Sequence, residues 1–168
     1  MPGTVYNVPP IPADPEHTTW VDAGALRIGI EYRLLDNDDL AANYQGAAME
    51  EIQSAMDGQA IEDNGVSIHV EGAKDGHEYL RFDCFENEPH YHYIDASGEK
   101  QTIMEFDRVA HGDMIAWAMQ QLRTRLSVML EYAGGGKVAA RVQPAEVEAA
   151  LQKAERLARD AEKALAEN

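Results

Sequence analysis

The sequence contains little cysteine, little basic charge and no long hydrophobic run. Its single cysteine, Cys84, excludes an internal disulfide and a cysteine-rich zinc or iron–sulfur site. Lys and Arg number 14 against 30 Asp and Glu, which gives a net charge of −16. Because phosphate groups repel this charge, we expect binding to neither nucleic acid nor an anionic membrane. The apolar runs are also far shorter than the roughly 20 residues that span a bilayer.

The prolines gather at the start of the chain. Five of the seven lie within residues 1–20, where they disfavour a helix or a central strand. We therefore expect residues 1–20 to form an extended arm, either disordered or wrapped around a neighbouring subunit. The same segment has no basic stretch followed by an apolar one, so we expect no secretory signal and a cytoplasmic protein.

Residues 21–133 carry both strand and helix patterns. Polar and apolar side chains alternate over 25–35, which predicts a half-buried strand, and residues 39–57 have apolar side chains at helical spacing. Four short alternating segments follow, joined by turn-forming residues, and 109–132 predicts a long amphipathic helix. This order predicts an α+β domain with an antiparallel sheet of about five strands, one face of which is covered by amphipathic helices.

A glycine-rich hinge at 134–143 separates this domain from a C-terminal helix at 144–168. The apolar residues of that helix follow heptad spacing: Val147, Leu151, Ala154, Ala158, Ala161 and Leu165. Such a thin, alanine-rich stripe suits close packing, either on the body of its own chain or on another chain, and the long hinge favours the second. We expect a homo-oligomer or a protein partner, bound through the N-terminal arm and the C-terminal helix.

The strand patterns also predict how the four-strand meander pairs. Turn lengths place His69 opposite Arg81, Asp83 opposite His92, and His90 opposite Glu105. All the predicted pairs agree on which face is buried against the helices. The other face then carries six polar side chains, namely His69, Arg81, Asp83, His90, His92 and Glu105.

A metal centre is one interpretation of this polar face. His90 and His92 lie two residues apart on one strand, so both imidazoles point the same way. Two histidines and a carboxylate from a neighbouring strand can bind zinc, iron(II) or manganese, and Asp83 or Glu105 would supply that carboxylate. Water or substrate would take the remaining coordination positions.

Arg81 and His69 are candidate ligand-binding residues on the same face. The guanidinium of Arg81 can bind an anionic substrate through two parallel contacts. The alternative is that the whole set consists of ordinary cross-strand polar pairs on a solvated face, worth roughly 0.2–1 kcal/mol each.

The segments Arg81–Phe85 (R-F-D-C-F) and Pro89–Tyr93 (P-H-Y-H-Y) resemble a pattern of uncharacterised small bacterial proteins. The resemblance covers about the central two-thirds of the chain and implies no function. The order of elements is also similar to a shortened helix-grip (START-like) domain, an analogy of architecture that does not give function.

Three functions are compatible with these patterns. The first is a small acidic accessory subunit of a larger assembly or homo-oligomer, since no specific catalytic motif is present. The second is a small metal-dependent enzyme or metal-binding protein that uses the histidine and carboxylate cluster. The third is a small-molecule carrier with a cavity between the sheet and the long helix.

Overall fold

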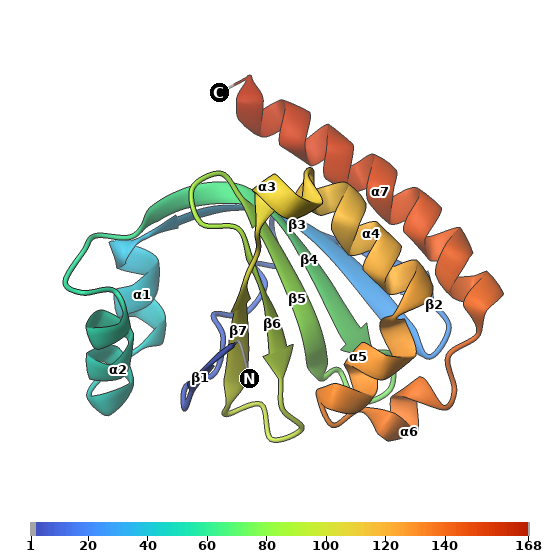
Figure 1. The fold of residues 1–168 in the computed structure, drawn as a ribbon, viewed down its shortest axis with the longest axis horizontal. Coiled ribbons are helices and arrows are strands. Elements are labelled where there is room, and N and C mark those ends of the chain that lie inside the picture. The colour runs from blue at the N-terminus through green and yellow to red at the C-terminus, as the bar shows by residue number, and fades with distance from the viewer. Residues whose placement is uncertain (1–2, 168) are drawn as a thin grey trace.

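The computed structural model describes residues 3–167 and has an α+β architecture (Figure 1). One antiparallel sheet contains seven strands: β1 (Thr4–Tyr6), β2 (Thr18–Ala23), β3 (Leu26–Asp36), β4 (Glu62–Gly72), β5 (Glu78–Phe85), β6 (His90–Ile94) and β7 (Gln101–Glu105). The helices are α1 (Asn37–Asn43), α2 (Ala47–Ala55), α3 (Arg108–His111), α4 (Met114–Thr124), α5 (Leu126–Tyr132), α6 (Gly136–Ala139) and α7 (Pro144–Ala166). None of the helices in these residues is both long and apolar enough to cross a membrane.

The sheet has seven strands rather than the expected five or so, in the order β1-β7-β6-β5-β4-β3-β2. The two additional strands form its edges, where the neighbouring prolines do not interrupt a ladder of hydrogen bonds. β1 is only three residues long, between Pro2 and Pro9. In β2 the large apolar Trp20 lies on the polar face, where it packs over Gly29, and this placement hides the alternation of the strand.

One face of the sheet packs against α4, α5 and α7, as the sequence predicts for the meander (Figure 1). The heptad stripe of α7 lies on β2, β3 and β4 of its own chain, and Leu151, Ala154 and Ala158 are fully buried there. The two alanines let the helix backbone approach the sheet closely. The stripe that favoured a partner chain in the sequence is therefore covered by the chain's own sheet.

Two expected helices are each divided. The pattern over 39–57 forms α1 and α2, because Gly46 adopts a positive φ of 58° between them. The pattern over 109–132 forms α3, α4 and α5. Gly112 (φ 75°) ends α3, the carboxylate of Asp113 caps the first turn of α4, and the backbone of Arg125 leaves helical geometry before α5.

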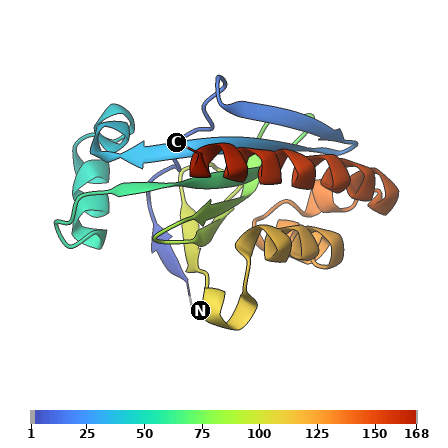
Figure 2. The same ribbon diagram turned by 90° about the horizontal axis from the view of Figure 1, so that it is seen from above.

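The other face of the sheet is covered by residues 7–17, which we call the strap. β1 and β2 lie at opposite edges of the sheet, six strand spacings or about 29 Å apart. The twelve steps from Tyr6 to Thr18 reach about 40 Å when fully extended. The segment therefore uses most of its reach to cross the face, and it ends in a turn at residues 15–17. Figure 2 shows this blue N-terminal segment running between the two edges.

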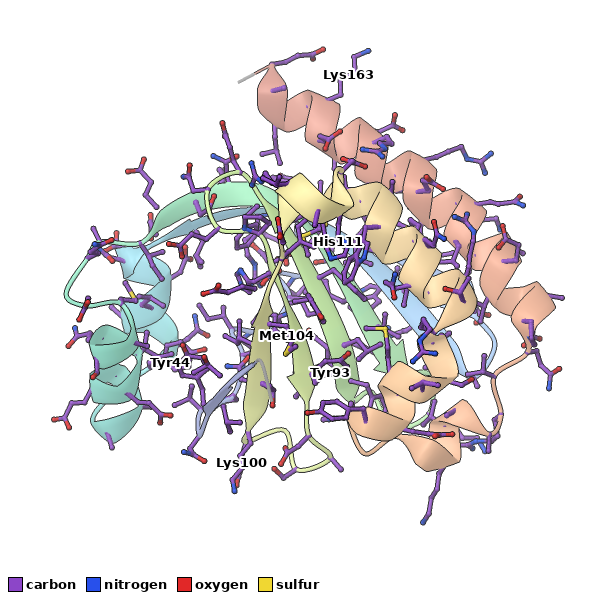
Figure 3. All side chains as sticks on the ribbon, in the orientation of Figure 1. Tyr44, Tyr93, Lys100, Met104, His111 and Lys163 are labelled. Carbon is purple, nitrogen blue, oxygen red and sulfur yellow. The ribbon has the colours of Figure 1, made fainter. Side chains whose placement is uncertain are left out.

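Backbone carbonyls hold the strap in place. Gln101 Nε2 donates to the Val8 carbonyl at 3.2 Å, and the Tyr44 hydroxyl donates to the Pro9 carbonyl at 2.7 Å. Arg33 donates to the Pro12 carbonyl, also at 2.7 Å. The buried Val8 side chain packs with Tyr44 and its neighbours in a second, smaller apolar cluster, between the sheet and helices α1 and α2 (Figure 3).

We predict that Leu151→Ala lowers the free energy of unfolding by about 2–5 kcal/mol, because it leaves a cavity between α7 and the sheet. Chemical denaturation measures the change. Val128→Ala, at a half-exposed position of α5, is the control and should change the free energy by less than about 0.5 kcal/mol. An unaltered unfolding free energy in Leu151→Ala would contradict the packing of α7 on its own chain.

Candidate metal centre

The strand pairing places the six predicted polar residues on one face, with one shift of register. His69 lies opposite Arg81, and His90 lies opposite Glu105, as predicted. Between β5 and β6, however, Asp83 lies opposite His90 and not His92. The predicted pairing of β5 with β6 was therefore wrong by two residues.

The loop between β5 and β6 explains the shift. It is wider than a tight turn, because the carboxylate of Asp63 accepts from the backbone N–H groups of Asn87 and Glu88. Arg108 also donates to the carbonyls of Phe85 and Glu86 at the start of this loop. A shift of two residues leaves every side chain on its predicted face, so the polar face is preserved.

The new register brings two imidazoles to one carboxylate. His92 Nε2 lies 2.8 Å from Asp83 Oδ2, and His90 Nε2 lies 3.2 Å from the same oxygen. The ligand atoms of the three residues lie within 4.8 Å of one another. Asp83, His90 and His92 thus form the predicted cluster of two histidines and one carboxylate, which we call the triad.

Each member of the triad is oriented by a further hydrogen bond. The Ser67 hydroxyl donates to Asp83 Oδ1 at 2.5 Å, which leaves Oδ2 directed at the histidines. His90 Nδ1 lies 2.7 Å from the Glu88 carbonyl, and His92 Nδ1 lies 2.7 Å from Gln101 Oε1. Hydrogen bonds of this kind fix the tautomer of metal-binding histidines in proteins.

These contacts establish where the imidazole protons lie. A backbone carbonyl can only accept, so His90 Nδ1 carries a hydrogen. The Gln101 amide donates through Nε2 to the Val8 carbonyl, so its Oε1 accepts from Nδ1 of His92. In the neutral tautomer, both Nε2 atoms therefore direct a lone pair toward the same carboxylate oxygen.

Burial and charge act differently on the two histidines. Burial lowers the pKa of His92 below its usual value despite the carboxylate of Asp83. Burial opposes protonation of His90 as well, but its contacts with Asp83 raise the pKa of that imidazole. Burial alone would raise the pKa of Asp83, but its contacts with the two imidazoles hold that pKa well below its ordinary value. The triad is therefore a carboxylate next to at least one neutral imidazole.

The triad is closed on one side and open on the other. The side chains of Asp83 and His92 are 4% and 6% exposed, whereas that of His90 is 21% exposed. Glu105 lies opposite His90 in the strand pairing, but its side chain is exposed and it does not join the triad. Of the two predicted carboxylates, Asp83 alone belongs to the centre.

His69 and Arg81 belong to a second polar cluster. His69 is fully buried, with Nε2 at 3.0 Å from Glu31 and Nδ1 at 3.2 Å from Glu78. Arg81 contacts both carboxylate oxygens of Glu78, at 2.6 and 3.1 Å, and Arg33 contacts Glu31 at 3.1 Å. The guanidinium predicted to bind an anionic ligand is thus engaged by a carboxylate of its own chain.

The imidazole of His69 carries both protons, because each nitrogen faces a carboxylate that can only accept. Burial alone would lower its pKa, but Glu78 and Glu31 raise the pKa above the usual value. The pKa of Glu78 is lowered, since Arg81 and His69 outweigh the effect of burial. The charges of this cluster therefore stabilise one another beneath the strap.

Four functional side chains were missed in the sequence: Ser67, Gln101, Glu31 and Glu78. Ser67 and Glu31 follow the period-two pattern of their strands, so their position on the polar face could have been read from it. Glu78 joins the face through a bulge between Val70 and Glu71, and Gln101 acts through contacts with both the strap and His92. Gln101 shares the alternation of Ile103 and Glu105 in β7, so its face could also have been read, whereas the bulge that places Glu78 has no local sequence signal.

An open cleft of about 740 Å³ lies on the helical face, where the sheet ends between the start of α4 and the end of α7. Its charged rim is already engaged, since Arg108 donates to two backbone carbonyls and Asp113 pairs with Arg159. Cys84 also lines this cleft, and burial raises the pKa of its thiol well above the usual value. Arg108 and Asp113 are therefore not free to bind a ligand in the cleft, and a raised thiol pKa disfavours the reactive thiolate.

Comparison with known proteins gives a family and no activity. The family described as "Domain of unknown function (DUF7700)" matches residues 20–158, and thus spans the sheet from β2, the triad and most of α7. No curated protein and no solved structure matched the chain.

We predict that the second cluster makes stability depend on pH. The folded-state pKa of His69 is raised, so its stabilising effect is complete below the unfolded value of about 6.5 and is lost as pH rises through the folded value. The free energy of unfolding of wild type minus that of His69→Gln should therefore be larger at about pH 6 than at about pH 9. His111→Gln, at an exposed position, is the control. A difference that grows with pH would contradict the arrangement.

Proposed function

The chain belongs to the DUF7700 family, and from the geometry of its polar face we propose that it binds a divalent transition metal through Asp83, His90 and His92. The ligand atoms are Asp83 Oδ2 and the Nε2 atoms of both histidines. One observation carries the proposal. Both imidazoles commit Nδ1–H to an oxygen acceptor and direct Nε2 at a single carboxylate oxygen.

The distances suit a metal with adjacent ligands at right angles. Metal–ligand bonds of about 2.1 Å at 90° place neighbouring ligand atoms about 3.0 Å apart, and tetrahedral angles place them about 3.4 Å apart. The separations of 2.8 and 3.2 Å from Asp83 Oδ2 lie around the first value. Both histidines therefore suit positions at right angles to Asp83, as in octahedral iron(II) sites, and zinc also accepts this donor set.

A cation also resolves an electrostatic conflict in the triad. With His92 neutral, its Nε2 lone pair faces a carboxylate oxygen at 2.8 Å, and both groups are buried. Protonating both rings would place two imidazolium ions with centroids 4.9 Å apart beside one carboxylate. A bound divalent metal attracts all three ligand atoms at once and requires no proton on either Nε2.

Three protein ligands leave coordination positions for water or substrate, as in catalytic metal sites. Water or substrate would reach a bound metal from the exposed side, next to His90. A metal there would act as a Lewis acid and lower the pKa of bound water. Glu105 is exposed and paired with His90 across the strands, so its carboxylate would be a candidate to accept a proton from such a water.

The function of an accessory subunit rested on two segments, the proline-rich arm and the C-terminal helix. In residues 3–167 both pack on their own chain: the strap lies over the polar face, and α7 lies on the helical face. The metal centre instead depends on contacts that are all made within the chain. For this reason we place metal binding first.

We expect the purified protein, stripped by a chelator, to bind one Co²⁺ per chain, followed by visible absorption and by native mass spectrometry. Asp83→Ala and His92→Ala should each weaken binding on the order of 100-fold or more, because each removes a ligand. His111→Ala is the matched control and should bind as wild type does. Equal affinities in His92→Ala and His111→Ala, or no binding by wild type, would refute the centre.

The hydroxyl of Ser67 provides a finer test. Ser67→Ala removes the hydrogen bond that orients Asp83 but leaves all three ligands, so Co²⁺ affinity should fall about 10- to 100-fold. Ser97→Ala, in the turn between β6 and β7, removes a hydroxyl bonded to a different aspartate and should leave the affinity unchanged. Identical affinities for the two serine variants would show that the carboxylate needs no such support.

A further inference from the structure

The side chain of Gln101 joins the strap to the triad. Its Nε2 donates to the Val8 carbonyl at 3.2 Å, and its Oε1 accepts from His92 Nδ1 at 2.7 Å. Gln101 is 3% exposed and His92 is 5% exposed, so water does not readily replace either bond. One amide thus contacts a proposed metal ligand with one end and the strap with the other.

Residues 7–17 form no β-strand, so no ladder of backbone hydrogen bonds joins the strap to the sheet. Side chains of the body reach its carbonyls, those of Gln101, Tyr44 and Arg33. Two strap N–H groups also donate to the body, Asp14 to Glu31 at 2.7 Å and Asn7 to Glu51 at 2.8 Å. The only apolar anchor in the strap that is fully buried is Val8, at 1% exposure among the described residues. Val8 is therefore the point at which apolar packing and the Gln101 bond both act.

We propose that metal occupancy of the triad and docking of the strap are coupled through Gln101, so that the N-terminal segment is a metal-responsive cover of the polar face. This inference rests on the metal-binding function proposed above. A metal on Nε2 of His92 withdraws electron density from the ring and makes Nδ1–H a stronger donor. The polarised Gln101 amide then donates more strongly to the Val8 carbonyl, because bonds in a chain reinforce one another.

Coupling of this kind is reciprocal. If the metal favours the docked strap, then the docked strap raises the affinity for the metal by the same factor. Couplings between sites in proteins are commonly about 5- to 150-fold in affinity. Loosening the strap at a point that touches no ligand should therefore weaken metal binding, and removing the metal should loosen the strap.

Val8→Ala tests the first half of the cycle. It trims a side chain that points into the small cluster with Leu40 and Tyr44, and it leaves Gln101 and the triad intact. We expect Co²⁺ affinity to fall at least about 5-fold. Val138→Ala, a buried valine of α6 in the main core, is the matched control and should bind Co²⁺ as wild type does.

Hydrogen exchange of the wild-type full chain tests the second half and does not depend on any variant. Saturation with Co²⁺ should slow amide exchange in the strap, measured on peptides that cover residues 7–17, by at least the factor by which Val8→Ala weakens binding. Gln101→Met keeps the length of the side chain without its amide. This variant should bind Co²⁺, although more weakly than wild type, and adding Co²⁺ should not change the rate of amide exchange in its strap.

The outcomes separate the two proposals. If wild type binds no metal, both the metal function and the coupling fail. Suppose that wild type binds metal, that Val8→Ala binds it as tightly as Val138→Ala, and that metal does not change amide exchange in the strap. The coupling is then wrong and the metal function stands. If strap exchange responds equally in wild type and in Gln101→Met, the coupling does not pass through Gln101 and the inference is overturned.

Discussion

The structure depends on the burial of a polar sheet face. Nine polar or charged residues are buried among those described. Eight of them belong to the two clusters on the face opposite the helices, and the ninth, Glu71, pairs with Arg27. A buried charge or hydrogen-bonding group without a partner costs more free energy than a typical bond returns, so each must be matched. The strap supplies part of that match, because its carbonyls accept from Gln101, Tyr44 and Arg33.

The topology explains why the strap is available. Since β1 and β2 lie at opposite edges, the chain must cross one face to connect them, and its prolines have no N–H groups that would need partners there. The helices cover the other face, with the aromatic side chain of Tyr93 directed toward Tyr132 on α5 (Figure 3). The polar face thus combines exclusion of water with an opening at His90, a combination that suits a reactive metal.

Period-two alternation was sufficient to predict five of the seven strands and their two faces, and it placed Asp83, Glu105, His90 and His92 on one face without choosing between the two carboxylates. Turn length also gave the pairings of β4 with β5 and of β6 with β7. Turn length gave the wrong register between β5 and β6. Alternation could not correct this register, because a shift of two residues leaves every side chain on its face. Contacts of Asp63 and Arg108 with the loop select the register instead. That shift places Asp83 opposite His90 and within reach of both imidazoles, whereas Glu105 keeps its predicted place opposite His90.

The strap, the bulge at Glu78 and the role of Gln101 could not be predicted, because each arises from contacts between segments far apart in the chain.

The proposal of a metal centre is tested most directly by anomalous diffraction from crystals grown with Zn²⁺ or Co²⁺ and recorded at the metal absorption edge. It predicts one strong peak about 2.1 Å from Asp83 Oδ2 and from Nε2 of His90 and His92. No peak between these atoms at saturating metal, with both imidazoles hydrogen-bonded to the carboxylate, would contradict it.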